Sequence, residues 1–274
     1  MQTYSIVFLD IDGTLLDSQH QIMPQTKHLL NRLERQGIPI ILCSARSPRG
    51  VDTVTRQAGL LSSPIACYSG SLVLASDRSI LHDFGIESSL AIRFKQFMTE
   101  RYPDLVVSAY LYDVWLVDDT EHPVIQWEAR ISECTPLQGS LDMAVQSVPH
   151  VHKLLCNGAP KQIMTLQNDA AKQFPQLNFA RSGPTYLEVM PKGSSKGKAV
   201  EVLQTYYGID RQAAVACGDS FVDLEMIRYA GLGIAMGNSP DPVKEAADRV
   251  TASNDEEGIY IALKNLKFTP PAEV

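Results

Sequence analysis

Short apolar runs alternate with amphipathic segments at both ends of the 274-residue chain. In the N-terminal part the apolar runs lie at residues 5–10, 38–43 and 64–69, and their length suits strands buried on both faces of a sheet. The segments between them, 24–37 and 48–58, begin with proline and predict helices. This order of strands and helices predicts a parallel sheet with right-handed crossovers.

The same order resumes after residue 192. It predicts helices at 199–207, 222–230 and 241–248 and strands at 213–217 and 231–236. We therefore expect an α/β fold whose core is a Rossmann-like parallel sheet, built from residues 1–82 and 190–274.

The central part of the chain, residues 83–189, has a different pattern. It combines short alternating strands with helical patterns near 90–100 and 161–173. We expect an inserted α+β cap domain that selects the substrate and is joined to the core by two hinges.

Polar residues follow the ends of the predicted core strands or precede the start of a predicted core helix. They are Asp10 and Asp12, then Ser44 and Arg46, then Lys196, then Asp219 and Asp223. An isolated Asp-x-Asp-Gly sequence is more often a simple turn. Because the carboxyl ends of parallel strands meet at one edge of a sheet, however, this ordered set predicts a single site.

The residue types in this set suit phosphoryl transfer. Carboxylate oxygens are the ligands that Mg²⁺ prefers, and it keeps waters for the substrate phosphate. Lys196 and Ser44 can offer positive charge and a hydrogen bond to phosphoryl oxygens. One carboxylate can attack phosphorus while another handles the proton of the leaving group.

These residues resemble a known family. Residues 10–14, 43–46, 192–197 and 218–223 look like the four motifs of the haloacid dehalogenase (HAD) superfamily, and 236–248 with 250–258 resemble its Cof-type branch with a class IIB cap. The resemblance spans nearly the whole chain. It implies a Mg²⁺-dependent phosphatase that acts on a small phosphorylated metabolite, such as a sugar phosphate, through an aspartyl-phosphate.

The resemblance also implies roles for the carboxylates. Asp10 would be the nucleophile and a metal ligand. Asp12 would be the general acid and then the general base, with its backbone carbonyl on the metal. Asp219 would bind the metal directly, and Asp223 would contact it through water.

For the remaining residues the resemblance implies contacts with the substrate. Ser44 and Lys196 would bind the phosphoryl group, and Arg46 and Asn238 are candidates for further substrate contacts. Two positions differ from the family's pattern: Val222 and Ser69 each stand where the family commonly has asparagine. Both differences bear on phosphate affinity and leave the nucleophile and the metal ligands in place.

Composition and charge indicate which binding partners and which cellular compartment to expect. The 24 Lys and Arg residues against 31 Asp and Glu give a net charge of -7 without a basic block, which argues against nucleic acid or an anionic membrane as a partner. The five cysteines lie far apart and predict buried thiols in a reducing compartment. With no apolar segment of membrane-spanning length, we expect a cytoplasmic protein.

Three alternatives stay open at the level of sequence. A phosphomutase could use the same aspartyl-phosphate and pass it to a sugar hydroxyl. A receiver-like signalling module also has an acceptor aspartate, Mg²⁺ and a lysine, and a catalytically weak protein could simply bind a phosphorylated ligand. The sequence does not specify the substrate, the cap residues that select it or the oligomeric state.

Overall fold

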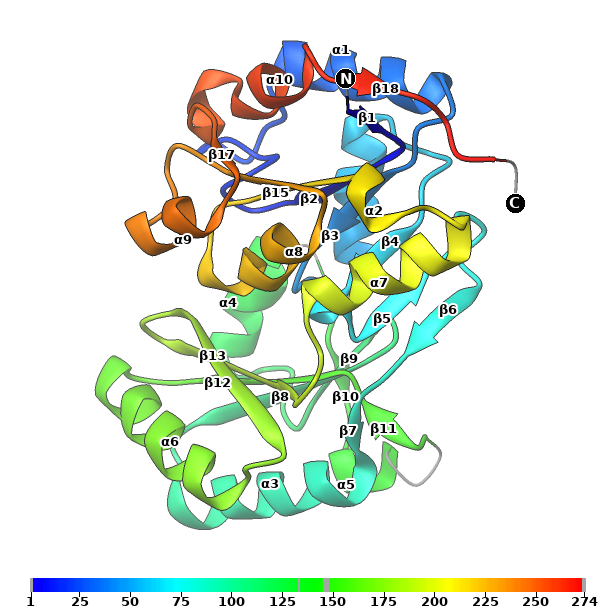
Figure 1. Ribbon diagram of the computed structural model, residues 1–274. Helices are drawn as coiled ribbons and strands as arrows, with labels where there is room; N and C mark the ends of the chain where they lie inside the picture. The colour runs from blue at the N-terminus through cyan, green and yellow to red at the C-terminus, as the bar shows by residue number, and fades with distance from the viewer. Residues whose placement is uncertain (1, 133, 145–147, 273–274) are drawn as a thin grey trace. The chain divides into compact units, whose positions relative to one another are not determined.

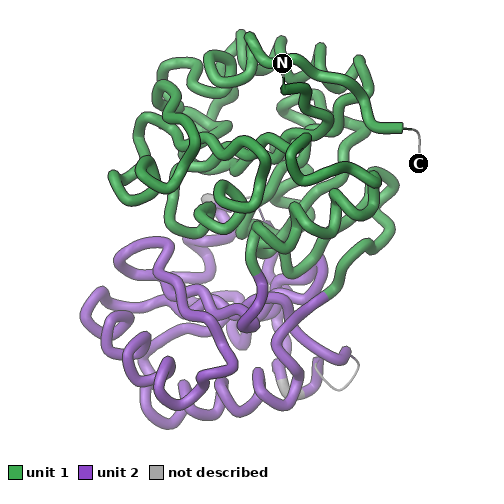
Figure 2. Tube along the Cα trace, viewed as in Figure 1, with its two compact units in different colours: residues 1–83, 195–274 green, residues 84–194 purple. Residues whose placement is uncertain are grey.

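The computed structural model describes residues 2–132, 134–144 and 148–272 (Figure 1). The chain forms two compact units, which Figure 2 colours separately. Unit 1 comprises Met1–Asp83 and Ser195–Val274, and unit 2 comprises Phe84–Ser194. The sequence placed the corresponding junctions after residues 82 and 189.

An eight-stranded sheet forms the centre of unit 1, in the order β17-β16-β15-β2-β3-β4-β5-β6. Its strands are β2 (Ile6–Asp10), β3 (Ile40–Cys43), β4 (Ile65–Cys67), β5 (Leu72–Leu74), β6 (Ile80–Asp83), β15 (Ala214–Gly218), β16 (Leu232–Ala235) and β17 (Arg249–Val250). Every pair from β17 to β4 is parallel, which confirms the predicted core. The β5–β6 hairpin differs, because it continues the sheet in antiparallel pairing.

Helices cover both faces of this sheet. They are α1 (Pro24–Arg35), α2 (Pro48–Ala58), α7 (Lys196–Tyr207), α8 (Leu224–Tyr229), α9 (Asp241–Ala246) and α10 (Gly258–Leu263). Ile6 and Phe8 pack in one cluster with residues of α7 and α8, which lie side by side in Figure 1. Since side chains alternate along a strand, Val7 and Leu9 point to the other face, where α1 and α2 contact β3. Asp10 therefore points to the same side as α7.

Shorter elements complete unit 1. They are the parallel pair β1 (Thr3–Tyr4) and β18 (Lys267–Phe268) and the 3-10 turns η1 (Tyr68–Gly70), η2 (Arg211–Ala213), η3 (Phe221–Asp223) and η4 (Asn254–Glu256). Two predicted helices have different limits. The helix predicted at 199–207 begins at Lys196, because the Ser195 hydroxyl accepts a hydrogen bond from Lys198 N and caps it. The one predicted at 222–230 is divided into η3 and α8.

Unit 2 is built on a six-stranded sheet in the order β10-β9-β8-β12-β14-β13, with a separate antiparallel pair, β7 and β11. Its strands are β7 (Ile86–Glu87), β8 (Val106–Leu111), β9 (Val114–Val117), β10 (Leu137–Gln138), β11 (His150–Val151), β12 (Lys153–Asn157), β13 (Leu177–Gly183) and β14 (Tyr186–Pro191). Its helices are α3 (Ser88–Arg101), α4 (Pro123–Ser132), α5 (Leu141–Ala144) and α6 (Pro160–Gln173). Mixed sheet and helices make this unit the α+β domain that the sequence suggests.

The core of unit 2 lies between the sheet and helices α3 and α6. Phe174 makes edge-on contacts with Phe94 and with Phe97, both with 5.4 Å between ring centroids. A smaller cluster joins α4 to the strands through Trp115, Val117 and Ile125. Across the described ranges of both units, no helix has the length and apolar character needed to cross a membrane.

Burial of the cysteines gives a first prediction. Cys43, Cys67, Cys156 and Cys217 are buried free thiols, whereas Cys134 is partly exposed. Burial raises the pKa of Cys43 and of Cys217 to about 12, so neither forms the reactive thiolate near neutral pH. An aromatic disulfide reagent should therefore label about one thiol in the folded protein and all five after unfolding. Rapid labelling of several thiols in the folded protein would contradict this core.

Candidate active site

A buried lysine links two carboxylates at the edge of the unit 1 sheet. Lys196 Nζ donates to Asp10 Oδ1 and to Asp223 Oδ1, both at 2.5 Å. The three side chains are at most 8% exposed. They come from the end of β2, the first residue of α7 and the η3 turn, so one ammonium group joins three separate elements.

Asp219 stands beside this group and is held by the turn that follows β2. Thr14 Oγ1 donates to its Oδ1 at 3.1 Å, and Asn238 Nδ2 donates to its Oδ2 at 3.3 Å and to the Gly13 carbonyl at 2.8 Å. Gly13 has φ +80°, and a Cβ on it would fall against the Asp219 carboxylate. Glycine is therefore required here both for the turn and for the close approach.

Both oxygens of Asp223 are engaged with the protein. Oδ1 receives the Lys196 bond, and Oδ2 accepts hydrogen bonds from Asp219 N, Ser220 N and Ser220 Oγ at 2.8–3.1 Å. Asp223 thus fixes the loop that carries Asp219. Thr14 and Ser220 are not among the residues that the sequence pattern selects, although Thr14 lies two positions after Asp12 and Ser220 directly follows Asp219.

The electrostatics of this cluster favour a bound cation. Asp10, Asp219 and Asp223 each place a carboxylate oxygen within 4.8 Å of the others. One lysine opposes three carboxylates, which leaves a net charge of about −2 when all are ionised. Burial raises the pKa of Asp10 well above its usual range although Lys196 opposes the shift, and Asp223 adds to it. Burial and Asp223 also raise the pKa of Asp219.

A divalent cation would remove this excess of negative charge, and the oxygen donors suit a hard metal ion. The lysine itself remains an ammonium: burial lowers the pKa of Lys196, but the Asp10 and Asp223 carboxylates outweigh burial and raise it. This carboxylate cluster can therefore accommodate a metal ion, with Lys196 as a fixed positive charge beside it.

Asp12 lies apart from the three clustered carboxylates. Its side chain is 50% exposed and accepts two hydrogen bonds from Arg46, at 2.9 Å from Nε and 2.5 Å from Nη2. Arg46, which the sequence offers as a substrate contact, is thus engaged with Asp12 in this structure.

Ser44 is buried at the end of β3 and is fixed by its backbone. Ser44 N donates to the Ala66 carbonyl at 2.9 Å, and the Ser44 carbonyl accepts from Ser69 N at 2.8 Å. Tyr68 and Ser69 both have positive φ, +50° and +52°, which non-glycine residues rarely adopt. This turn holds the predicted phosphate-binding serine in place. Val222, the other departure from the family's pattern, is 44% exposed.

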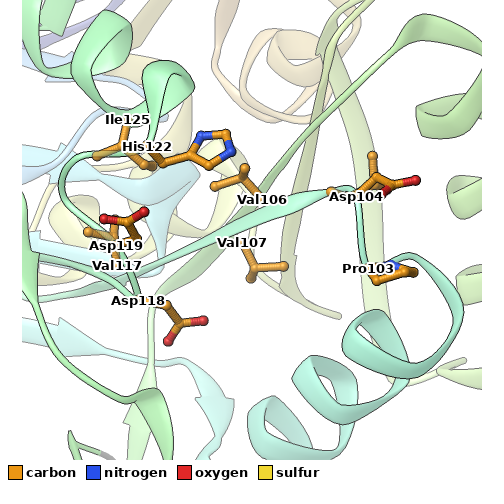
Figure 3. Close-up of a pocket in the computed structure, with 10 residues that line it drawn as sticks. Pro103, Asp104, Val106, Val107, Val117, Asp118, Asp119, His122 and Ile125 are labelled. Atoms are coloured by element: carbon orange, nitrogen blue, oxygen red, sulfur yellow. The ribbon is translucent and has the colours of Figure 1, made fainter.

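A cavity of about 450 Å³ is present in unit 2 (Figure 3). It is lined by Pro103–Val107, Val117–Asp119, His122 and Ile125. Lys95 is bonded to Asp118 at 2.5 Å, and Asp119 accepts a hydrogen bond from Glu121 N. Since its described lining contains no Lys or Arg, this cavity is unsuited to a phosphate group, unlike the site around Lys196.

The fold and the carboxylate cluster define an α/β protein with a buried, metal-type acidic site at the carboxyl edge of a parallel sheet. A family model described as haloacid dehalogenase-like hydrolase matches residues 7–263. The chain belongs to this family, which confirms the resemblance in its sequence and identifies it as a hydrolase.

Comparison with individual proteins agrees with the family. A Haemophilus influenzae protein named "Putative phosphatase" is 34% identical over 95% of this chain and 97% of its own length. The 5-amino-6-(5-phospho-D-ribitylamino)uracil phosphatase YitU of Bacillus subtilis is 27% identical over 94% of this chain and 96% of its own. Among solved structures, a HAD subclass IIB sugar phosphatase has the same fold, with a TM-score of 0.80, 22% identity and coverage of 95% of this chain and 98% of its own.

Removing the lysine should destabilise unit 1. In Lys196→Met the Asp10, Asp219 and Asp223 carboxylates lose their buried counter-charge. Without added metal, we expect the free energy of unfolding in urea to fall by about 3–5 kcal/mol.

Lys198→Met is the matched control, because Lys198 is two residues away and 39% exposed, and pairs with Glu201. It should change the free energy of unfolding by less than about 1 kcal/mol. Equal losses in the two variants would show that the Lys196 contacts contribute nothing special to stability.

Proposed function

We propose that the protein is a Mg²⁺-dependent phosphatase that hydrolyses a small phosphorylated metabolite through an aspartyl-phosphate, an acyl phosphate formed on Asp10. The observation that supports this most strongly is the buried Asp10 carboxylate, bonded to Lys196 and within 4.8 Å of two further carboxylates. A nucleophile, a fixed positive charge and a metal-type site are the groups that phosphoryl transfer requires.

In the first step, an Asp10 oxygen forms a bond to phosphorus while the bond from phosphorus to the leaving oxygen breaks. Asp12 gives its proton to that leaving oxygen. In the second step, a water oxygen bonds to phosphorus and gives a proton to Asp12, and the bond from phosphorus to Asp10 breaks. Inorganic phosphate leaves, and Asp10 and Asp12 return to their starting states.

The other residues bind and orient the phosphoryl group in this proposal. Lys196 is already an ammonium beside Asp10 and can neutralise charge on the transferring group. The hydroxyl of Ser44, whose carbonyl accepts a hydrogen bond from Ser69 N, can donate to a phosphoryl oxygen. Asn238, bonded to Gly13 and Asp219, stabilises the loop beside the metal ligands and is close enough in the fold to serve as a further substrate contact.

Asp10, Asp219 and the Asp12 backbone carbonyl are the proposed Mg²⁺ ligands. Asp223 has both oxygens occupied by protein hydrogen bonds, which supports a contact through water. When bound, the metal supplies positive charge that offsets the phosphate charge and the carboxylate excess.

The proposed substrate class is a small phosphorylated metabolite such as a sugar phosphate. The names of the Haemophilus influenzae and Bacillus subtilis relatives support phosphatase activity, and the latter's substrate is a phosphorylated ribityl compound. We propose that unit 2 serves as the cap that selects the substrate. Five free cysteines suit a reducing compartment, so we place the enzyme in the cytoplasm.

Replacing the nucleophile should abolish turnover. In Asp10→Asn the amide cannot form the acyl phosphate, so phosphate release from a panel of phosphorylated sugars, sugar alcohols and nucleotides should fall by at least about 10³-fold. Asp17→Asn, the same change at a residue whose carboxylate accepts from Gln19 N and Gln21 N of its own turn, should retain activity. The products should be inorganic phosphate and alcohol; conversion to an isomeric sugar phosphate would instead establish a mutase.

Magnesium should stabilise the folded protein through the carboxylate cluster. At about 100 times its dissociation constant, Mg²⁺ should raise the free energy of unfolding by about 2.7 kcal/mol. Asp219→Asn should remove most of this increment, whereas Asp210→Asn, at an exposed residue that caps η2, should keep it. If Mg²⁺ raised the free energy of unfolding of Asp219→Asn as much as that of the wild type, the ion would bind at another site.

A further inference from the structure

The pair formed by Arg46 and Asp12 carries an inference that rests on the proposed function. We infer that Arg46 is a positioning residue, which acts on the reaction by holding the Asp12 carboxylate in the orientation needed for proton transfer. Two different nitrogens of the guanidinium bind the two different oxygens of the carboxylate, at 2.9 and 2.5 Å. A two-point contact of this kind fixes the plane of the carboxylate as well as its distance.

Arg46 is itself anchored before it reaches Asp12. Arg46 N donates to Ser44 Oγ at 3.2 Å, and its carbonyl accepts from Tyr68 N at 3.1 Å. Gly50 on α2 faces the aliphatic stem, and a Cβ there would lie 3.2 Å from the Arg46 Cβ. The guanidinium therefore extends from a fixed backbone, along a stem that lies beside Gly50.

Asp12, in contrast, has little else to fix its side chain. Its backbone forms a bridge with Leu16, but the side chain is half exposed and follows the end of β2. Within the described part of the chain, both hydrogen bonds to its carboxylate come from Arg46. Without Arg46, the Asp12 side chain would be free to occupy several rotamers.

The pair is a poor candidate for a purely structural contact. Its side chains are 34% and 50% exposed, and ion pairs at such positions contribute about 0–1 kcal/mol to stability. Proton transfer is more sensitive, since misplacing a catalytic group by about 1 Å can cost about 100-fold in rate. The effect of Arg46 should therefore be seen in turnover and hardly at all in stability.

A double-mutant cycle with Arg46→Gln and Asp12→Asn tests this directly. Arg46→Gln should lower kcat by about 10–100-fold with KM, and competitive inhibition by inorganic phosphate, nearly unchanged. Because Arg46 acts through Asp12, the double variant should be no slower than Asp12→Asn alone. Arg56→Gln, an exposed arginine near the C-terminal end of α2, is the control and should match the wild type.

A chromogenic aryl phosphate gives a second measurement on the same variants. Its phenolate leaves without a proton, whereas hydrolysis of the acyl phosphate still needs Asp12 as a base. Arg46→Gln should therefore show a rapid burst of phenolate followed by slow turnover. If Arg46→Gln does not fold, Arg46→Lys, which keeps the charge but loses the two-point contact, replaces it in both experiments.

Two results would overturn the inference. One is an additive loss in the double variant; the other is a rise in KM and in the inhibition constant of phosphate without a change in kcat. The first would mean that Arg46 acts independently of Asp12. The second would make Arg46 a direct substrate contact. Both results differ from failure of the proposed function, which would appear as wild-type protein that releases no phosphate from any tested ester.

Discussion

The candidate site depends on one buried ammonium group. Lys196 is the first residue of α7, where the helix dipole disfavours a positive charge, and it is almost completely removed from water. Its bonds to Asp10 and Asp223 offset both costs. Because these partners come from the end of β2 and from η3, the same contacts that keep the lysine charged also assemble the site.

The four carboxylates around this lysine have different surroundings. Asp223 is saturated with hydrogen bonds and holds the loop. Burial raises the pKa of Asp10 and of Asp219, because the ionised carboxylates are unfavourable there without a counter-charge. A cation bound beside them would supply that counter-charge. Asp12 lies outside this group of three carboxylates, and its half-exposed side chain is paired with Arg46.

Much of this arrangement follows from the sequence. The unbroken apolar run within residues 5–10 predicts a strand buried on both faces. Polar residues at the ends of predicted strands select Asp10, Asp219 and Asp223 before any geometry is known. The distant contacts do not follow. The Arg46–Asp12 pair joins side chains 34 positions apart and depends on rotamers, and the short β5 strand has too few residues for a periodic signal. Tyr68 and Ser69 adopt positive φ values, which non-glycine residues disfavour. The sequence does not predict this turn, because contacts with distant parts of the chain impose it.

The central claim is that the substrate's phosphoryl group passes through Asp10. Acid quenching during turnover, followed by borohydride reduction and peptide mass spectrometry, tests it most directly, because an acyl phosphate on aspartate is reduced to homoserine. We predict homoserine at position 10, formed only in the presence of substrate and metal. Phosphate release without modification at this position, or with modification at another residue, would contradict the account.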